Sequence, residues 1–205
     1  MTSTTSADRA IRHESGFGRA LRGKLHQFWE GRESSSTKAS LARLRRTVTS
    51  PLEECTEIWD VVLPDLPNSM GKFGDAPTFE ERAAHLCLAL YATHQQSKSA
   101  SQHVAGNRWG QSVNALAQQV PTTQTRFATL LAVGEFAELS NHLMSLVTQM
   151  RAKDIPTDYV ALGQDLLEFQ VPSRRSAVLL RWSRQFYNPP RKDNRTEQIL
   201  NETGE

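Results

Sequence analysis

Residues 125–187 contain three apolar, periodic segments with a proline before the second and third, and this pattern predicts three linked α-helices that pack on one another. In the first segment, apolar residues recur at spacings of three and four, the period of one buried helix face. They are Phe136, Leu139, Leu143, Leu146, Val147 and Met150. The second segment follows Pro156, with Thr157 as its expected N-cap, and the third follows Pro172, with Ser173 as its expected N-cap. The inward residues of the second are Tyr159, Leu162, Leu166 and Phe169.

The third predicted helix separates apolar from basic residues. At about 100° per residue, one side carries Val178, Leu179, Trp182 and Phe186. The other side carries Arg174, Arg181 and Arg184, which we expect in a row on the outer surface. Guanidinium groups bind phosphate oxygens in pairs, so a fixed row of them suits a nucleic-acid backbone. The same pattern also fits an ordinary solvated face.

The rest of the chain also reads as helical, because no stretch of strand length alternates with period two. We therefore predict an all-α bundle of about eight or nine helices in two small subdomains. The remaining helices are expected over Arg19–Glu30, Lys38–Val48, Pro51–Val62, Thr78–His94 and Trp109–Gln119. The expected divisions are a disordered tail (1–16), an N-terminal helical subdomain (17–120), a C-terminal bundle (121–187) and a flexible tail (188–205), with a loop at 64–77.

Two of these helices carry specific expectations. Thr78 and Glu81 form a capping box that opens a helix apolar nearly all round, which should therefore be central. The segment after Pro51 should bury one face, made of Leu52, Cys55, Ile58, Trp59 and Val62. All four tryptophans lie on apolar faces, so we expect core packing for each of them: Trp29, Trp59, Trp109 and Trp182.

Charge is distributed in bands along the chain. The formal net charge is only +2, but residues 1–50 carry +6, 51–96 carry −6, 97–134 carry +3, 135–172 carry −4 and 173–205 carry +3. A folded chain can gather the basic bands on one surface while the acidic bands face elsewhere. We expect that convergence, with cations drawn from the first, third and last bands.

Residue patterns that would indicate an enzyme, a metal site or a membrane span are missing from the sequence. None of the six histidines has a metal-ligand spacing, and there is no phosphate-binding glycine loop or nucleophile motif. Cys55 and Cys87 lie in apolar stretches and are expected to be buried free thiols. No apolar run is long enough for a membrane span, and the polar N-terminus has no secretory signal, so a cytoplasmic protein without cofactor or metal is expected.

Four segments together resemble the CasB family, the small subunit of the type I-E CRISPR effector complex Cascade. They are LARLRR (41–46), TRFATLLA (125–132), HLMSLVTQMRAKDIPTDYVALGQDLLEF (142–169) and RRSAVLLRWSRQFY (174–187). With the helix order between them, the resemblance covers about residues 19–187. The two tails and the 64–77 loop lie outside it.

The resemblance implies a non-catalytic, all-helical protein that works with other Cascade subunits and a second copy of itself, placed head to tail. It further implies contacts with guide RNA and target DNA that stabilise their pairing and the displaced strand during antiviral defence. The residues that it assigns to nucleic-acid binding are Arg45, Arg46, Arg126, Arg174, Arg175, Arg181 and Arg184, with Lys98 and Arg108 in a loop that is also basic in the family.

Two other functions fit the sequence. A helical scaffold could dock its basic face on acidic protein surfaces, including the acidic bands of a second copy. A catalytic bundle would instead gather Glu and His side chains in one partly buried pocket.

Overall fold

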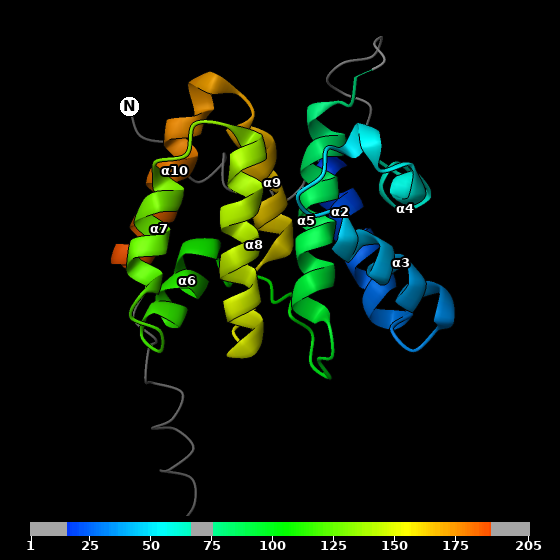
Figure 1. Ribbon diagram of the computed structural model, residues 1–205, viewed down its shortest axis with the longest axis horizontal. Coiled ribbons are helices and arrows are strands. Elements are labelled where there is room, and N and C mark those ends of the chain that lie inside the picture. The colour runs from blue at the N-terminus through cyan, green and yellow to red at the C-terminus, as the bar shows by residue number, and fades with distance from the viewer. Residues whose placement is uncertain (1–15, 67–75, 190–205) are drawn as a thin grey trace, which may run out of the picture.

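The computed structural model describes residues 16–66 and 76–189 (Figure 1). Within these ranges the named elements are all helices, and one isolated β-bridge pairs His103 with Thr157. In chain order, the α-helices are α2 (Gly16–Glu30), α3 (Ser35–Arg46), α4 (Trp59–Val62), α5 (Phe79–Gln95), α6 (Trp109–Ala117), α7 (Thr123–Leu131), α8 (Phe136–Ala152), α9 (Tyr159–Phe169) and α10 (Pro172–Tyr187). The 3₁₀-helices η1 (Leu52–Glu54) and η2 (Thr56–Ile58) precede α4. The predicted all-α fold is confirmed. Gly16 begins α2, while the rest of the expected N-terminal tail, residues 190–205 and residues 67–75 lie outside the described residues.

Helix α5 lies at the centre of the molecule, with α8 on one side and α2 and α3 on the other (Figure 1). Its N-terminus has the predicted capping box: Thr78 Oγ1 accepts the Glu81 backbone N–H at 3.2 Å, and Glu81 Oε2 accepts the Thr78 N–H at 2.7 Å. Residues on all sides of the helix are buried from Ala83 to Gln95. A helix that is apolar nearly all round has to be enclosed by others, so the predicted central position is confirmed.

Helices α8, α9 and α10 bury the predicted apolar faces, but the two expected caps are wrong. Asp158, and not Thr157, caps α9 by accepting the Ala161 N–H at 3.0 Å. The Thr157 hydroxyl instead donates to the Asn107 carbonyl oxygen, because Thr157 pairs with the 103–107 loop. Helix α10 begins at Pro172 itself, which has no N–H to cap, so Ser173 lies within the first turn.

The segment after Pro51 is not one helix, contrary to prediction. It forms η1, η2 and the short α4, which bury Leu52, Cys55 and Ile58. These three buried residues are three positions apart in the sequence, which matches the three residues per turn of a 3₁₀-helix. Trp59 follows Ile58 directly and therefore points elsewhere: its side chain is 41% exposed, and its indole N–H donates to the Leu52 carbonyl oxygen at 3.0 Å. Core packing of Trp59 is thus a wrong prediction.

Helices α6 and α10 pack closely on each other. Trp109 and Trp182 are buried as predicted, with ring centroids 6.2 Å apart, whereas Trp29 is half-buried under the guanidinium of Arg32. The close approach requires glycine at position 110, whose backbone N–H donates to Gln185 Oε1 at 3.1 Å. This pair spans the expected subdomain boundary at 120/121, which stays a prediction. Within the described ranges, no helix is both long and apolar enough to cross a bilayer.

Candidate nucleic-acid interface

Arg45 and Arg46 end α3 and meet a third arginine that comes from α8. Arg46 is exposed and Arg45 is half-buried. Burial, followed by the charges of Arg151 and Arg46, lowers the pKa of the Arg45 guanidinium below its usual value. The Arg45 guanidinium is therefore close enough to Arg46 and to Arg151 of α8 to be affected by both charges. Such a concentration of cations raises the local potential for an anionic partner.

Arg151 is a residue that the sequence reasoning missed. It lies in the last turn of α8, and its Nη1 donates to Gln96 Oε1 just after α5, which holds the guanidinium between the two helices. In a sequence, a basic residue near a helix C-terminus needs no functional explanation, because its positive charge interacts favourably with the helix dipole. A signal was present, however, since residues 139–153 contain no acid and end in Arg151 and Lys153.

Arg126 lies on α7, along the other flank of α8. It is exposed, and its Nη1 donates to the hydroxyl of Ser145 on α8 at 3.1 Å. Helix α7 contains no acid, and the acids of α8 and its N-cap are confined to the N-terminal end, at Glu135 and Glu138. The surface carried by Arg45, Arg46, Arg126 and Arg151 on either side of α8 is called the α8 basic surface below.

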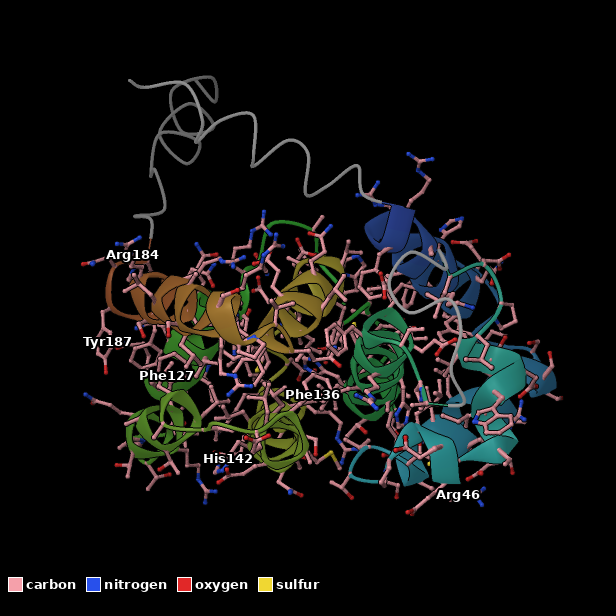
Figure 2. The ribbon with its side chains drawn as sticks, turned by 90° about the horizontal axis from the view of Figure 1, so that it is seen from above. Arg46, Phe127, Phe136, His142, Arg184 and Tyr187 are labelled. Carbon is pink, nitrogen blue, oxygen red and sulfur yellow. The ribbon has the colours of Figure 1, made fainter. Side chains whose placement is uncertain are left out.

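The arginines of α10 lie elsewhere. Figure 2 shows Arg46 and His142 of α8 along one edge of the molecule and Arg184 near the opposite edge. Arg174 and Arg184 are exposed, and the guanidinium of Arg175 lies over the Phe169 ring at 5.1 Å. The predicted convergence is therefore partial, because Arg46 at the end of α3 and Arg184 of α10 lie near different sides of the molecule.

The expected outward row on α10 is wrong at Arg181. Its Nη1 lies 2.6 Å from Asp165 Oδ1 and its Nη2 lies 2.7 Å from Glu168 Oε2, both carboxylates being on α9. Trp182 Nε1 donates to the other Asp165 oxygen at 2.7 Å. Burial raises the pKa of Asp165 to about 6, against the opposing effect of the Arg181 charge. Arg181 thus joins α10 to α9 and compensates a buried carboxylate.

Lys98 and Arg108 are also engaged with acids. Lys98 Nζ lies 2.6 Å from Asp154 Oδ1, with only 20% of its side chain exposed. Arg108 is the half-buried N-cap residue of α6, and its charge is one of those that lower the pKa of Asp165. Each of these cations is balanced in part by a neighbouring carboxylate. They therefore offer less to a phosphate than Arg46 or Arg126.

His85, His94 and both cysteines are buried. Burial lowers the pKa of His85 and of His94 to about 4, so both rings are neutral at pH 7. Cys55 and Cys87 are buried free thiols, as predicted. No group of three His, Cys, Asp or Glu side chains that could hold a metal ion occurs among the residues that the structure describes.

Comparison with known proteins gives consistent matches. The family model described as CRISPR-associated protein Cse2 matches residues 40–187. The crystal structure of CasB from Thermobifida fusca is 27% identical, with a TM-score of 0.72 over 84% of this chain and 98% of that chain. A Cse2-family CRISPR-associated protein from Thermus thermophilus is 24% identical, with a TM-score of 0.63 over 82% and 97%. A chain of a CRISPR RNA-guided surveillance complex is 20% identical, with a TM-score of 0.65 over 92% and 99%. No curated protein matches the chain.

Proposed function

The chain belongs to the CRISPR-associated protein Cse2 family, and we propose that it is a non-catalytic subunit of an RNA-guided CRISPR surveillance complex of the Cascade type. In this proposal it binds nucleic acid without sequence preference, and it stabilises the pairing of guide RNA with target DNA and the displaced strand. Its partners are the other subunits of the complex, a second copy of itself, the guide RNA and the target DNA. The observation that carries the proposal is the electrostatic coupling of Arg45 to its neighbour Arg46 and to Arg151, which comes from a distant part of the chain.

The chemistry of the α8 basic surface supports backbone contact. Two of its arginines are held by uncharged partners, Arg126 by Ser145 and Arg151 by Gln96, so the charges of these two remain available. Rigid guanidinium groups bind phosphate oxygens without reading bases. Exchange of a DNA duplex for an RNA–DNA duplex is nearly balanced in free energy, so a few such contacts can tip it.

The salt dependence of single-stranded DNA binding tests this proposal. We expect Arg45→Ala/Arg46→Ala/Arg126→Ala to flatten the slope of log K against log salt by about 2, since each phosphate contact contributes about −0.7 on a single strand. Gel-shift titration of a thymidine oligonucleotide between low and moderate salt measures the slope. Arg43→Ala is the matched control, because Arg43 lies on the same helix but is paired with Asp60 at 2.9 Å. An unchanged slope in the triple variant would exclude these three arginines as phosphate contacts.

Arg174, Arg175 and Arg184 are proposed as contacts of a separate nucleic-acid segment, on the α10 side. Helix α10 has no acid, and the acids nearest along the chain, Asp165 and Glu168, are engaged by Arg181. Arginines on the α10 side could therefore contact a second nucleic-acid strand that does not lie on the α8 basic surface. Arg181, Lys98 and Arg108 are assigned supporting roles, because their charges are already balanced.

The two ends of the molecule favour contact with a second copy. At one end, α4 exposes Trp59 (41%), and Leu63 (37%) follows it; Glu57 lies beside them, whereas Asp60 is paired with Arg43. At the other end, α10 exposes Leu180 (50%), Tyr187 (55%) and Arg184. Helices α4 and α10 lie at opposite ends of the long axis (Figure 1). Apolar groups with an acid at one end and apolar groups with a cation at the other are complementary head to tail.

A mixing experiment distinguishes a head-to-tail contact from a symmetric one. We expect Trp59→Ala and Tyr187→Ala each to weaken self-association about 30-fold, as for a buried aromatic anchor. An equimolar mixture of the two variants should regain wild-type affinity, because each retains the end that the other lacks. Sedimentation equilibrium measures both. A mixture as weak as the single variants would contradict the head-to-tail arrangement.

A further inference from the structure

A cavity of about 290 Å³ lies beside the loop that follows Arg45 and Arg46 at the end of α3. Its walls come from the loop that follows α3, from α5, and from the first turns of α8. Figure 2 shows Phe136, which lines the cavity, in the interior of the view between Arg46 and His142. The volume is at the small end of ligand pockets, which run from about 300 to 1,000 Å³. There is room for one small planar group.

The cavity wall is mainly apolar and includes one aromatic ring. Val48, Leu52, Leu86 and Phe136 supply this apolar surface. Phe136 is only partly buried, although it packs against the core. Apolar walls with an aromatic side chain favour a flat ring, because stacking on an aromatic side chain tolerates any base.

Half of the residues that line the cavity are polar: Thr49, Ser50, Glu53, Arg82, His85 and Ser140. The hydrogen-bonding role of His85 is fixed by its neighbour Thr47. The Thr47 hydroxyl donates to the Leu44 carbonyl oxygen, so its oxygen accepts from His85 Nε2 at 2.9 Å. The neutral His85 ring therefore carries its hydrogen on Nε2, and its Nδ1 can only accept. Arg82 and Glu53 also line the cavity. A neutral ligand with ring N–H or amino groups satisfies this set better than a phosphate, which Glu53 would repel.

The position of the cavity relative to Arg45 and Arg46 connects it to a nucleic-acid strand. Val48 is two residues after Arg46, so their Cα atoms are at most about 7.6 Å apart. A phosphate held at Arg46 would thus be bound by the segment that leads directly into the cavity wall. The loop that follows the arginines is the same loop that forms one wall.

We propose that this cavity receives a single nucleobase, turned out of a strand whose backbone lies on Arg45 and Arg46. The inference rests on the proposed nucleic-acid binding, and it adds a base-binding site to a surface that otherwise contacts only the backbone. The polar half of the lining favours this occupant over an apolar side chain of a partner protein. It includes the Arg82 cation, the Glu53 carboxylate and the His85 acceptor, which suit the polar edge of a base.

The test compares oligonucleotides that do and do not carry bases. A fluorescein-labelled thymidine oligomer and an abasic oligomer of equal length and charge are titrated with the full chain, and binding is followed by anisotropy. We expect the thymidine oligomer to bind about tenfold more tightly, the size of one stacking contact. Ala137→Trp should remove that difference and leave binding of the abasic oligomer unchanged. Ala137 lines the cavity and is exposed, so the indole can fill the mouth without entering the core.

Controls separate failure of the cavity from failure of the proposed function. Ala177→Trp, at an exposed position on α10, should keep the tenfold preference. Arg45→Ala/Arg46→Ala should weaken both oligomers equally. If the abasic oligomer binds as tightly as thymidine, or if Ala137→Trp keeps the preference, the base site is wrong while backbone binding stands. If Ala137→Trp spares the preference and instead weakens self-association, the cavity belongs to a protein contact. If neither oligomer binds, both the base site and the proposed function are wrong.

Discussion

Arg181→Met is expected to lower the free energy of unfolding by about 3 kcal/mol at pH 8, because Asp165 then loses its cation and must be buried as a bare carboxylate or take up a proton two pH units above its pKa of about 6. The side chain of Asp165 is only 9% exposed, and Arg181 Nη1 lies 2.6 Å from its Oδ1. Methionine keeps most of the arginine stem, so the loss reports the charge and not the packing. Urea unfolding followed by tryptophan fluorescence measures it. Arg184→Met, at an exposed position on the same helix, is the control and should change stability by less than about 0.5 kcal/mol.

The pH dependence of this loss has a definite sign. Burial raises the folded-state pKa of Asp165 from 3.8 to about 6, so the folded protein holds that proton more tightly than the unfolded chain does. The contribution of Asp165 to stability is therefore fully present below about pH 4 and is lost as pH rises through 6. Without Arg181 the pKa rises further, and stability continues to fall above pH 6. The difference between wild type and Arg181→Met should be larger at pH 8 than at pH 5.

A double variant checks the cause. Asp165→Asn/Arg181→Met removes the buried charge together with its cation, and it should recover part of the loss seen in Arg181→Met. Two side chains in direct contact are expected to show such coupling. An additive double variant, or an Arg181→Met variant no less stable than Arg184→Met, would mean that the α9–α10 ion pair contributes nothing.

Local sequence signals predicted most of the helices because those signals act over a few residues. The capping box at Thr78 and Glu81 and the three-and-four spacing of α8 are both read within a single helix. The caps of α9 and α10 were misplaced, since proline geometry and a contact with a distant loop decided them. The 3₁₀ turns were missed because a spacing of three fits both kinds of helix for a short stretch.

The candidate site was predicted less completely, because the availability of a charge depends on partners from other helices. Arg181 looked like Arg174 and Arg184 on a helical wheel, but Asp165 and Glu168 of α9 lie within reach of Arg181. Conversely, Arg151 lies in an acidic band of the sequence, yet in the fold its charge lowers the pKa of Arg45. The net charges of the sequence bands predicted that arginines would gather on one surface, but they did not predict which arginines.

Gly110→Ala is expected to destabilise the protein by about 3 kcal/mol, although alanine is the better helix former. An added Cβ at position 110 would lie well inside van der Waals contact with the Trp182 carbonyl oxygen and 2.7 Å from Gln185 Cβ. The first obstacle is the backbone of α10, so α6 and α10 must separate, at the upper end of the usual cost of overpacking. Loss of closely packed contact between Trp109 and Trp182 should accompany the change as a shift in tryptophan emission.

Two other Gly→Ala variants provide comparisons for the stability of Gly110→Ala. At Gly163 an added Cβ would meet the end of the Leu21 side chain and the Cys87 sulfur at 3.2 Å, so we expect a smaller loss, because side-chain atoms can shift. At Gly23, inside α2, no atom lies within 4 Å, and Gly23→Ala should stabilise the protein by up to about 1 kcal/mol. Urea midpoints should therefore rank Gly23→Ala above wild type, then Gly163→Ala, then Gly110→Ala. A Gly110→Ala variant as stable as wild type would show that α6 and α10 pack less closely than described, and the buried position of Trp109 would have to be revised with them.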